Sequence, residues 1–413
     1  MSRTLNIITT ITFVILALAI VGGLTWANTR YAGQHPGEKD FFVPWLAAGT
    51  FLKYGNSPYS EPAAQRAQVI YYGRLATQAE DSLRLSIPFP VELFYFPLAL
   101  ISDYALARGL WMTFLEIALI ALALYSLRLT GWKPARTFMP VFLAFSIIWV
   151  YGMLPLTGGS MVIFSSLAIV ALLLAIRDGR DEMAGALLVV PFLQLDISIL
   201  LVIFILWWAL YHHRGRLVAG FLMTLTILMA TSFFILSNWF FPFIAGLVSH
   251  LGYLPSLSPG GIFVSWWPVV GPRLGWLLTG FLLVVLFFEW RNVRHRDFRH
   301  FLWTTCLTLA VTPLIGVPVI PQYFELLFFP LILFLSILVE RWSLPNRWGL
   351  SAFVFIAIVL GLWGITAGLF LVGSYAALSE VLALFFPFLL VVGLYWMRWW
   401  AVRPPRTWSD SLP

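Results

Sequence analysis

The chain has 413 residues, of which 61% are hydrophobic and only 10% are charged, whereas soluble proteins carry about 25% charged residues. This composition excludes an ordinary soluble enzyme. Several apolar runs approach the ~20 residues that cross a bilayer as a helix, and they do not alternate as transmembrane β-strands do. The net charge of +7 is therefore interpreted as a report of membrane orientation rather than of nucleic-acid binding. We expect an all-α integral membrane protein.

Basic residues gather between the apolar runs, and an excess of Lys and Arg marks cytoplasmic loops. If every such cluster is cytoplasmic, each interval between clusters crosses the membrane an even number of times. This rule predicts a single polytopic domain over residues 1–413, with about 12 transmembrane helices and both termini cytoplasmic. The predicted spans are single crossings at 5–28, 104–127, 217–241 and 274–290, and hairpins at 138–176, 183–211, 300–339 and 349–397.

Residues 29–86 form the only substantial polar region, and we expect them to be a long first outer loop. Short amphipathic surface helices are predicted in this loop at 45–53 and 61–79. Residues 87–103 are apolar but short and broken by prolines, so they are predicted to dip into the outer side of the membrane. Residues 242–272 are predicted to be a second outer loop. Because the first loop is too small for an independent catalytic domain, any chemistry must use it together with the membrane body.

Asp40 lies just beyond the first predicted span and is followed by Phe41 and Phe42. A carboxylate at the water interface can act as a general base toward a sugar hydroxyl. It can also be the N-cap of a surface helix running from Phe41 to Lys53, where its oxygen would accept hydrogen bonds from backbone N–H groups. Spacing alone leaves both interpretations open.

Further polar residues interrupt apolar outer segments. Glu92 lies close to Tyr95 in a proline-broken segment, where a carboxylate is costly unless it is solvated or paired. Pairing with Lys53 or Arg84 is the structural interpretation. Glu116 lies in the middle of a predicted span, where a role in helix packing or in a cavity is favoured over chemistry.

Two hairpin tips carry the remaining candidates. Gln194 and Asp196 lie at the tip of the shortest hairpin, and Asp196 is either functional or the N-cap of the returning helix. Gln322, Tyr323 and Glu325 follow the proline at the tip of 300–339. The topology predicts that these residues share an outer cavity with Asp40, although scattered interface residues would give the same pattern. No metal or cofactor motif is present in the sequence, and a requirement for a divalent metal stays open.

The first outer loop resembles that of a known family. The motifs are Asp40-Phe41-Phe42, Trp45-Leu46-Ala47-Ala48-Gly49 and Gly55-Asn56-Ser57-Pro58-Tyr59, followed by Tyr95-Phe96-Pro97-Leu98, Ala184-Gly185 and Pro321-Gln322-Tyr323. They resemble glycosyltransferase family 87, which contains polyprenyl-phosphate-mannose-dependent mannosyltransferase-like proteins of the GT-C superfamily. The resemblance covers the whole chain as topology and about 40 residues as motif.

The resemblance implies a GT-C fold in a bacterial plasma membrane. It also implies inverting transfer of a sugar, such as mannose, from a polyprenyl-phosphate donor to a glycolipid or glycan acceptor on the outer face. Asp40 would be the general base. The residues expected to bind substrate are Tyr59, Glu92, Tyr95, Gln194, Asp196, Gln322, Tyr323 and Glu325.

The chain departs from the family pattern at two tips. Gly158-Gly159-Ser160 stands where family members tend to carry Gly-Gln-Asn, and Gln194 stands near a position where they tend to carry a lysine. The donor phosphate would then be bound elsewhere, with Lys53, Arg66, Arg84 and Arg273 as candidates. The alternative functions are a transporter or flippase for an amphiphilic or lipid-linked substrate, and a diverged family member or membrane scaffold without catalysis.

Overall fold

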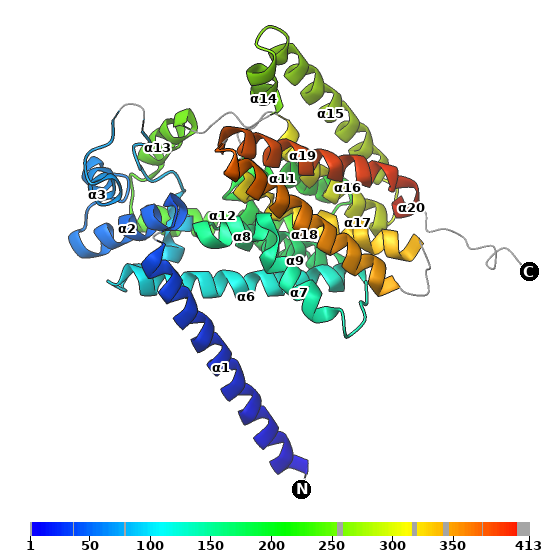
Figure 1. Ribbon diagram of the computed structural model, residues 1–413, viewed down its shortest axis with the longest axis horizontal. Coiled ribbons are helices and arrows are strands. Elements are labelled where there is room, and N and C mark those ends of the chain that lie inside the picture. The colour runs from blue at the N-terminus through cyan, green and yellow to red at the C-terminus, as the bar shows by residue number, and fades with distance from the viewer. Residues whose placement is uncertain are drawn as a thin grey trace, which may run out of the picture. The chain divides into compact units, whose positions relative to one another are not determined.

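The computed structural model describes residues 2–35, 37–77, 80–253, 259–315, 320–341, 347–373 and 375–402, and within these ranges every regular element is helical (Figure 1). The chain divides into two compact units. Unit 1 comprises residues 1–117, 156–160 and 238–250, and unit 2 comprises the remainder.

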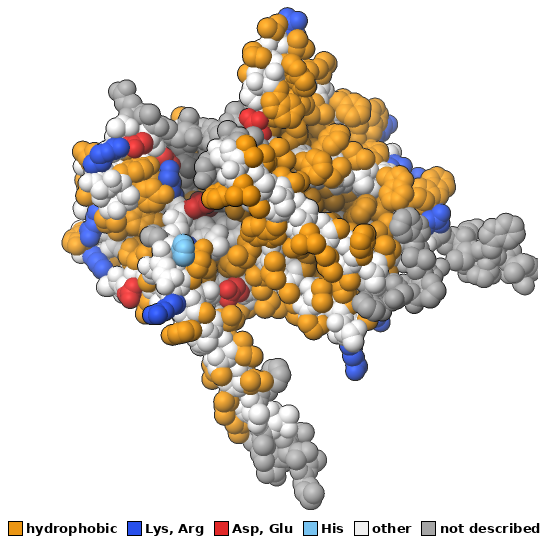
Figure 2. Space-filling view, viewed as in Figure 1, with side chains coloured by type: hydrophobic (Ala, Val, Ile, Leu, Met, Phe, Trp, Pro, Cys, Tyr) orange, Lys and Arg blue, Asp and Glu red, His pale blue; other side chains and the backbone are white. Residues whose placement is uncertain are grey.

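Six helices are long and apolar enough to cross a membrane, which confirms a multi-pass helical membrane protein. They lie at Thr9–Gln34, Tyr104–Thr130, Gly215–Ile235, Gly271–Val293, Pro321–Arg341 and Gly349–Leu371. A seventh candidate is the pair Met139–Ile148 and Val150–Gly158, which is bent by 55°. Apolar side chains are exposed along many of these helices, as Figure 2 shows for one face, and such surfaces suit contact with lipid.

The finer prediction of about 12 crossings is not confirmed. Every predicted span contains helix, but several of these helices are short. The hairpin predicted at 183–211, for example, begins with a helix of 12 residues at Asp181–Phe192. At ~1.5 Å per residue it is about 18 Å long, less than the ~30 Å hydrocarbon core. Its role as a crossing therefore stays a prediction.

Unit 1 consists of the helices that form the predicted first outer loop and of the helices that flank it in the chain or pack with it. They are α1 (Ser2–Gln34), α2 (Lys39–Tyr54), α3 (Glu61–Tyr72), α4 (Phe89–Glu92), the 3-10 turn η1 (Leu93–Tyr95), α5 (Phe96–Ala99), the first half of α6 (Tyr104–Thr130) and most of α13 (Phe240–Tyr253). Gly55 ends α2 with φ 69°, a left-handed conformation that glycine adopts without strain. The buried face of α2 packs on α3 and on residues 83–85 through an apolar core.

The C-terminal end of α1 binds α6 through a polar seam. Asn28 donates hydrogen bonds to the Thr113 hydroxyl at 3.1 Å and to the Glu116 carboxylate at 3.1 Å. Gly109 allows the close approach, since a Cβ there would lie 2.3 Å from the Thr29 hydroxyl. The predicted packing role of Glu116 is confirmed by its bond to α1.

Unit 2 contains the remaining helices. They are α7 (Met139–Ile148), α8 (Val150–Gly158, up to Pro155), α9 (Val162–Arg177), α10 (Asp181–Phe192), α11 (Leu195–Tyr211), α12 (Gly215–Ile235), α14 (Pro259–Trp266), α15 (Gly271–Val293), α16 (Phe298–Val311), α17 (Phe328–Arg341), α18 (Arg347–Leu371), α19 (Tyr375–Trp396) and α20 (Arg398–Val402), with 3-10 turns η2 (Thr312–Leu314) and η3 (Pro321–Leu327). The predicted second outer loop, 242–272, thus holds most of α13 and all of α14.

Two close contacts organise unit 2. Helices α10 and α12 approach each other at glycines, because a Cβ on Gly185 would lie 2.1 Å from the Leu217 carbonyl oxygen. Elsewhere Arg398 binds both carboxylate oxygens of Glu289 at 2.9 Å, and the Tyr395 hydroxyl donates to the same carboxylate at 2.9 Å. Arg–carboxylate pairs of this bidentate kind fix the orientation of both side chains.

Candidate functional site

Asp40 lies in the first turn of α2, six residues after Gln34, the last residue of α1. The N-cap position belongs to Glu38, whose side chain makes no capping hydrogen bond. The interpretation of Asp40 as the N-cap is therefore wrong by two positions, because the helix begins before it. A carboxylate inside the first turn still interacts favourably with the positive end of the helix dipole.

An aromatic cluster holds this first turn in place. The ring of Phe41 lies about 6 Å, centroid to centroid, from the rings of Tyr95, Tyr104 and Trp111. Phe41 is fully buried and Asp40 is half-buried. Burial of the next residue along the chain thus fixes the backbone that carries the Asp40 carboxylate.

The predicted residues of unit 1 gather around α2. Both Asp40 and Glu92 interact electrostatically with Tyr95, and Glu92 also interacts with Tyr59. The Tyr59 hydroxyl donates a 2.8 Å hydrogen bond to the Ile87 carbonyl. The structure therefore brings together Asp40, Tyr59, Glu92 and Tyr95, which the sequence spreads over about 55 residues.

Glu92 is completely buried, with 0% of its surface exposed. Neither carboxyl oxygen accepts a hydrogen bond of normal geometry within the described residues, although the Ala48 amide faces the group. Segment 89–99 has 11 residues, about 16 Å of helix, and is too short to span a bilayer. Burial raises the pKa of the Glu92 carboxyl well above its usual range, and the Ala48 amide offsets only part of this effect.

The predicted pairing of Glu92 with Lys53 or Arg84 is wrong. Arg84 forms its ion pair with Glu61, within the outer loop. Lys53 lies at the far end of α2 and makes no ion pair among the described residues. Because a buried carboxyl without a cation is least costly in its neutral form, burial favours the protonated form of Glu92 over a carboxylate base.

This assignment predicts the pH dependence of stability. The unfolded carboxyl has a pKa of about 4.5 and the folded one a raised pKa. The stabilising contribution of protonated Glu92 is complete below about pH 4.5 and is lost as the pH rises through the folded pKa, because unfolding then releases the proton. Thermal unfolding in detergent should show a decline in stability as the pH rises above about 4.5, and Glu92→Gln should reduce this decline. Glu61→Gln, an exposed control, should keep the wild-type profile; parallel profiles for wild type and Glu92→Gln would contradict the assignment.

Arg108 is a residue that the sequence reasoning did not select. Only 1% of its surface is exposed, and its guanidinium donates hydrogen bonds to the backbone carbonyls of His35 and Thr157. It thereby ties the end of α1, next to the connection before α2, to the tip at residues 156–160. The one sequence signal that could have identified it is its position in the second turn of an apolar helix, α6.

The tip at residues 156–160 lies against the first turn of α2. Trp111 donates a 2.9 Å hydrogen bond from its indole nitrogen to the Gly159 carbonyl. Gly159 has φ 79°, and a Cβ there would lie 2.6 Å from the Phe41 Cβ. The tip at which the family motif departs is thus in contact with the residue next to Asp40.

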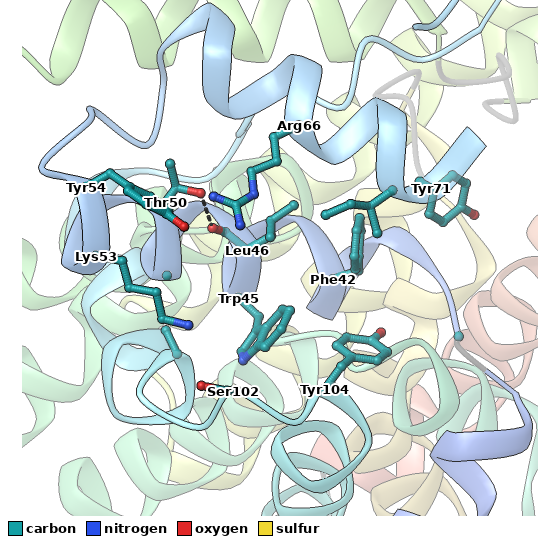
Figure 3. Close-up of a pocket in the computed structure, with 14 residues that line it drawn as sticks. Phe42, Trp45, Leu46, Thr50, Lys53, Tyr54, Arg66, Tyr71, Ser102 and Tyr104 are labelled. Carbon is teal, nitrogen blue, oxygen red and sulfur yellow. Dashed lines mark hydrogen bonds between the residues drawn. The ribbon is translucent and has the colours of Figure 1, made fainter. Parts of the chain in front are cut away.

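A cavity of about 850 Å³ lies on another face of α2 (Figure 3). Phe42, Leu46, Gly49 and Lys53 line it and recur every three or four residues, so they share one helix face. Asp40 stands two residues before Phe42 and is therefore rotated by about 200° around the helix. The cavity and the carboxyl cluster are two separate features of unit 1.

The cavity contains two of the four predicted phosphate-binding residues, Lys53 from α2 and Arg66 from α3. Lys53 follows Asp40 by 13 positions, which is about 20 Å along the helix axis. A phosphate held at Lys53 therefore cannot place its attached sugar carbon beside Asp40. Arg84 forms an ion pair with Glu61. In this arrangement, therefore, neither Lys53 nor Arg84 is placed to bind the phosphate of a sugar donor at Asp40.

The remaining candidates belong to unit 2. Gln194 occupies the N-cap position of α11 and accepts a hydrogen bond from Ser165, whereas the side chain of Asp196 lies outside the described residues. Because α11 begins after Gln194, Asp196 is not its N-cap. Arg273 is exposed in the first turn of α15.

Turn η3 carries the other three predicted residues of unit 2. Gln322 is buried, Tyr323 is half-buried and Glu325 is completely buried. The Trp149 indole donates a 2.9 Å hydrogen bond to one oxygen of Glu325, and the other oxygen has no hydrogen-bond partner within the described residues. The predicted sharing of one cavity between these residues and Asp40 stays a prediction.

Comparisons with protein-family models, with curated proteins and with solved structures gave no match for this chain. Among the described residues, no three His, Cys, Asp or Glu side chains lie close enough to hold a metal ion. The family resemblance therefore rests on the sequence motifs and on the order of the apolar segments.

Proposed function

We propose that the protein is an integral-membrane glycosyltransferase of GT-C type. It would transfer a sugar, such as mannose, from a polyprenyl-phosphate donor to a glycolipid or glycan acceptor. The observation that carries this proposal is Asp40, a half-buried carboxylate at the start of α2, held by the buried Phe41 and grouped with Glu92 and Tyr95. The resemblance of the loop motifs to glycosyltransferase family 87 is the second support.

In the proposed reaction, Asp40 takes the proton of an acceptor hydroxyl as its oxygen attacks the anomeric carbon of the donor. The bond from that carbon to the phosphate oxygen breaks, and the polyprenyl phosphate leaves with its electron pair. Attack opposite the leaving group inverts the anomeric configuration. General-base assistance of this kind contributes roughly 10²–10⁴-fold in rate.

Glu92 has a different part in the proposal, because a protonated carboxyl donates a hydrogen bond and cannot act as a base. Its neutral O–H would hold a substrate oxygen or the Tyr95 side chain. Two carboxyl groups whose environments set different protonation states are a recurrent arrangement in enzymes that use acid and base groups together. The burial of Glu92 beside a half-exposed Asp40 supports this division of roles.

The finer topology belongs to the same proposal. About 12 crossings with both termini on the cytoplasmic side would place residues 29–86 outside a bacterial plasma membrane. The donor would then enter laterally from the lipid, as its polyprenyl chain requires. The asymmetric distribution of basic clusters supports this orientation.

A transfer assay tests the function. The purified protein in lipid nanodiscs would be supplied with polyprenyl-phosphate sugars and a glycolipid acceptor, and the products would be analysed by mass spectrometry and by NMR of the anomeric proton. We expect a product with the configuration opposite to that of the donor. A product that retains the donor configuration would rule out the proposed single displacement.

A second candidate, a flippase for a lipid-linked substrate, is supported by unit 2. Glu325 is a fully buried carboxyl within a candidate span, and α7 and α8 form a helix pair bent by 55°. Intramembrane carboxyl groups and broken helices are typical of transporters. If this function is correct, Glu325→Gln should abolish substrate movement across proteoliposomes; if the protein is a transferase, Asp40→Asn should abolish transfer while no movement of lipid is detected in wild type.

A further inference from the structure

The cavity between α2 and α3 is lined by aromatic side chains and by two cations, and it lies apart from the Asp40 cluster. Its described lining contains no Asp or Glu. The lining residues are Gly37, Phe42, Trp45, Leu46, Gly49, Thr50, Lys53, Tyr54, Arg66, Ile70, Tyr71, Ala99, Ser102 and Tyr104. A cavity of about 850 Å³ with a mostly apolar lining and a few polar groups has the size and composition of a small-molecule site.

The charge of the cavity is not balanced by the protein. Three other basic residues of the loop each form an ion pair with a nearby carboxylate. The Lys39 nitrogen lies 3.1 Å from an oxygen of Asp81, an Arg74 nitrogen lies 2.7 Å from an oxygen of Glu80, and Arg84 pairs with Glu61. Lys53 and Arg66 make no ion pair within the described residues. Two uncompensated cations therefore face one cavity.

The two cations approach the cavity from different elements. Figure 3 shows Lys53 reaching in from α2 and the guanidinium of Arg66 reaching in from α3, on either side of the space beside Trp45. Arg66 lies over the Tyr54 ring at 5.0 Å, which fixes one face of the guanidinium and leaves its N–H groups at the edge for an acceptor. A single anionic group between them would receive charge-assisted hydrogen bonds from both sides.

The aromatic side chains supply flat surfaces beside this charge. The Trp45 indole is fixed by a 3.1 Å hydrogen bond from its nitrogen to the Leu98 carbonyl, and its ring packs edge-on against Tyr104 at 5.2 Å. A fixed aromatic face can stack on the apolar face of a sugar ring. The arrangement therefore suits a ring next to an anionic group.

We propose that this cavity binds a phosphorylated sugar, with the phosphate between Lys53 and Arg66 and the ring on Trp45. The ligand is either a free sugar phosphate or the phosphorylated sugar-like head group of a lipid, since both present the same chemistry. The site is independent of the proposed transfer reaction, because it lies on a different face of α2 from Asp40. It gives the protein a second, anion-specific binding function.

Binding measurements with two probes test this proposal. In the first arm, glucose 6-phosphate is titrated by calorimetry into the full-length protein in phosphatidylcholine nanodiscs. In the second, the protein is purified from nanodiscs containing phosphatidylinositol, and the lipid retained is quantified by native mass spectrometry. Binding in the first arm alone identifies a soluble ligand, and retention in the second identifies a lipid head group.

The decisive comparison uses two double variants that remove the same formal charge. Lys53→Gln/Arg66→Gln should weaken binding by about tenfold for each cation removed, because hydrogen bonds to charged groups are lost. Arg74→Gln/Arg84→Gln should bind as wild type, and Lys53→Arg/Arg66→Lys should retain most of the affinity. Elution volume and melting temperature of each variant establish that it is folded.

Three results would overturn the proposal. Wild-type protein that binds neither probe has no such site. Unchanged affinity in folded Lys53→Gln/Arg66→Gln would show that the cavity cations do not hold the anion. An equal loss in both double variants would show that binding reflects the net charge of the loop rather than this cavity.

Discussion

Replacing Asp40 by Asn should lower sugar transfer by roughly 10²–10⁴-fold while the protein stays folded. The amide is nearly isosteric with the carboxylate but cannot take up the proton of an acceptor hydroxyl. Since Asp40 is in the first turn of α2 and is not its N-cap residue, and Asn keeps its size and one acceptor oxygen, the stability change should be small, with a helix-dipole contribution of about 0.3–1 kcal/mol. Initial rates at saturating donor and the apparent melting temperature would be measured on the same preparation.

Glu38→Gln is the matched control, because it removes the same charge two residues earlier, at the N-cap position. It should retain activity close to that of wild type. The donor should still bind to Asp40→Asn, so the loss should fall on kcat rather than on KM. Full activity in Asp40→Asn would remove this residue from catalysis, whereas equal losses in the two variants would indicate a general effect of loop charge.

The largest expected effect on stability comes from Gly185→Ala at the crossing of α10 and α12. The added Cβ would lie 2.1 Å from the Leu217 carbonyl oxygen and 2.6 Å from the Phe221 nitrogen. Both atoms belong to the backbone of α12, so a rotamer change cannot relieve the clash and the helices must move apart. We expect a loss of about 3 kcal/mol and a marked fall in the apparent melting temperature in detergent.

Gly364→Ala provides the control for this substitution. It makes the same change inside a long apolar helix, α18, where a Cβ would meet nothing within 4 Å. Since alanine is favoured over glycine in a helix by up to about 1 kcal/mol, this variant should be as stable as wild type or slightly more so. If Gly185→Ala and Gly364→Ala have the same apparent melting temperature, α10 and α12 do not pack as closely as described.

The membrane character and the positions of the helices could be predicted because they depend on local hydrophobicity. The polar residues 29–86 also gave two helices near the predicted ranges, with Gly55 and Gly73 at their ends in the left-handed conformation. The number of crossings could not be confirmed. Short helices such as α10 have the composition of a span but not the length, and composition alone does not show whether a neighbour or lipid covers them.

The candidate site was harder to predict because it depends on which polar groups meet. Hydrophobic patterning does not reveal that Glu61 takes Arg84, or that Glu92 is left without a cation. Likewise, Lys53 falls on a different face of α2 from Asp40 because the helix begins at Lys39 and continues without interruption to Tyr54. The role of Arg108 follows only from the backbone carbonyls that the fold brings to it.

A structure of the protein with a bound, non-hydrolysable polyprenyl-phosphate sugar would test the central claim most directly. The base must lie about 3 Å from the acceptor oxygen, and that oxygen about 3–3.5 Å from the reacting carbon. We therefore expect the anomeric carbon within about 7 Å of the Asp40 carboxylate, with the lipid chain leading into the membrane. A donor bound only between Lys53 and Arg66, with no sugar near the Asp40 carboxylate, would contradict the proposed role of Asp40.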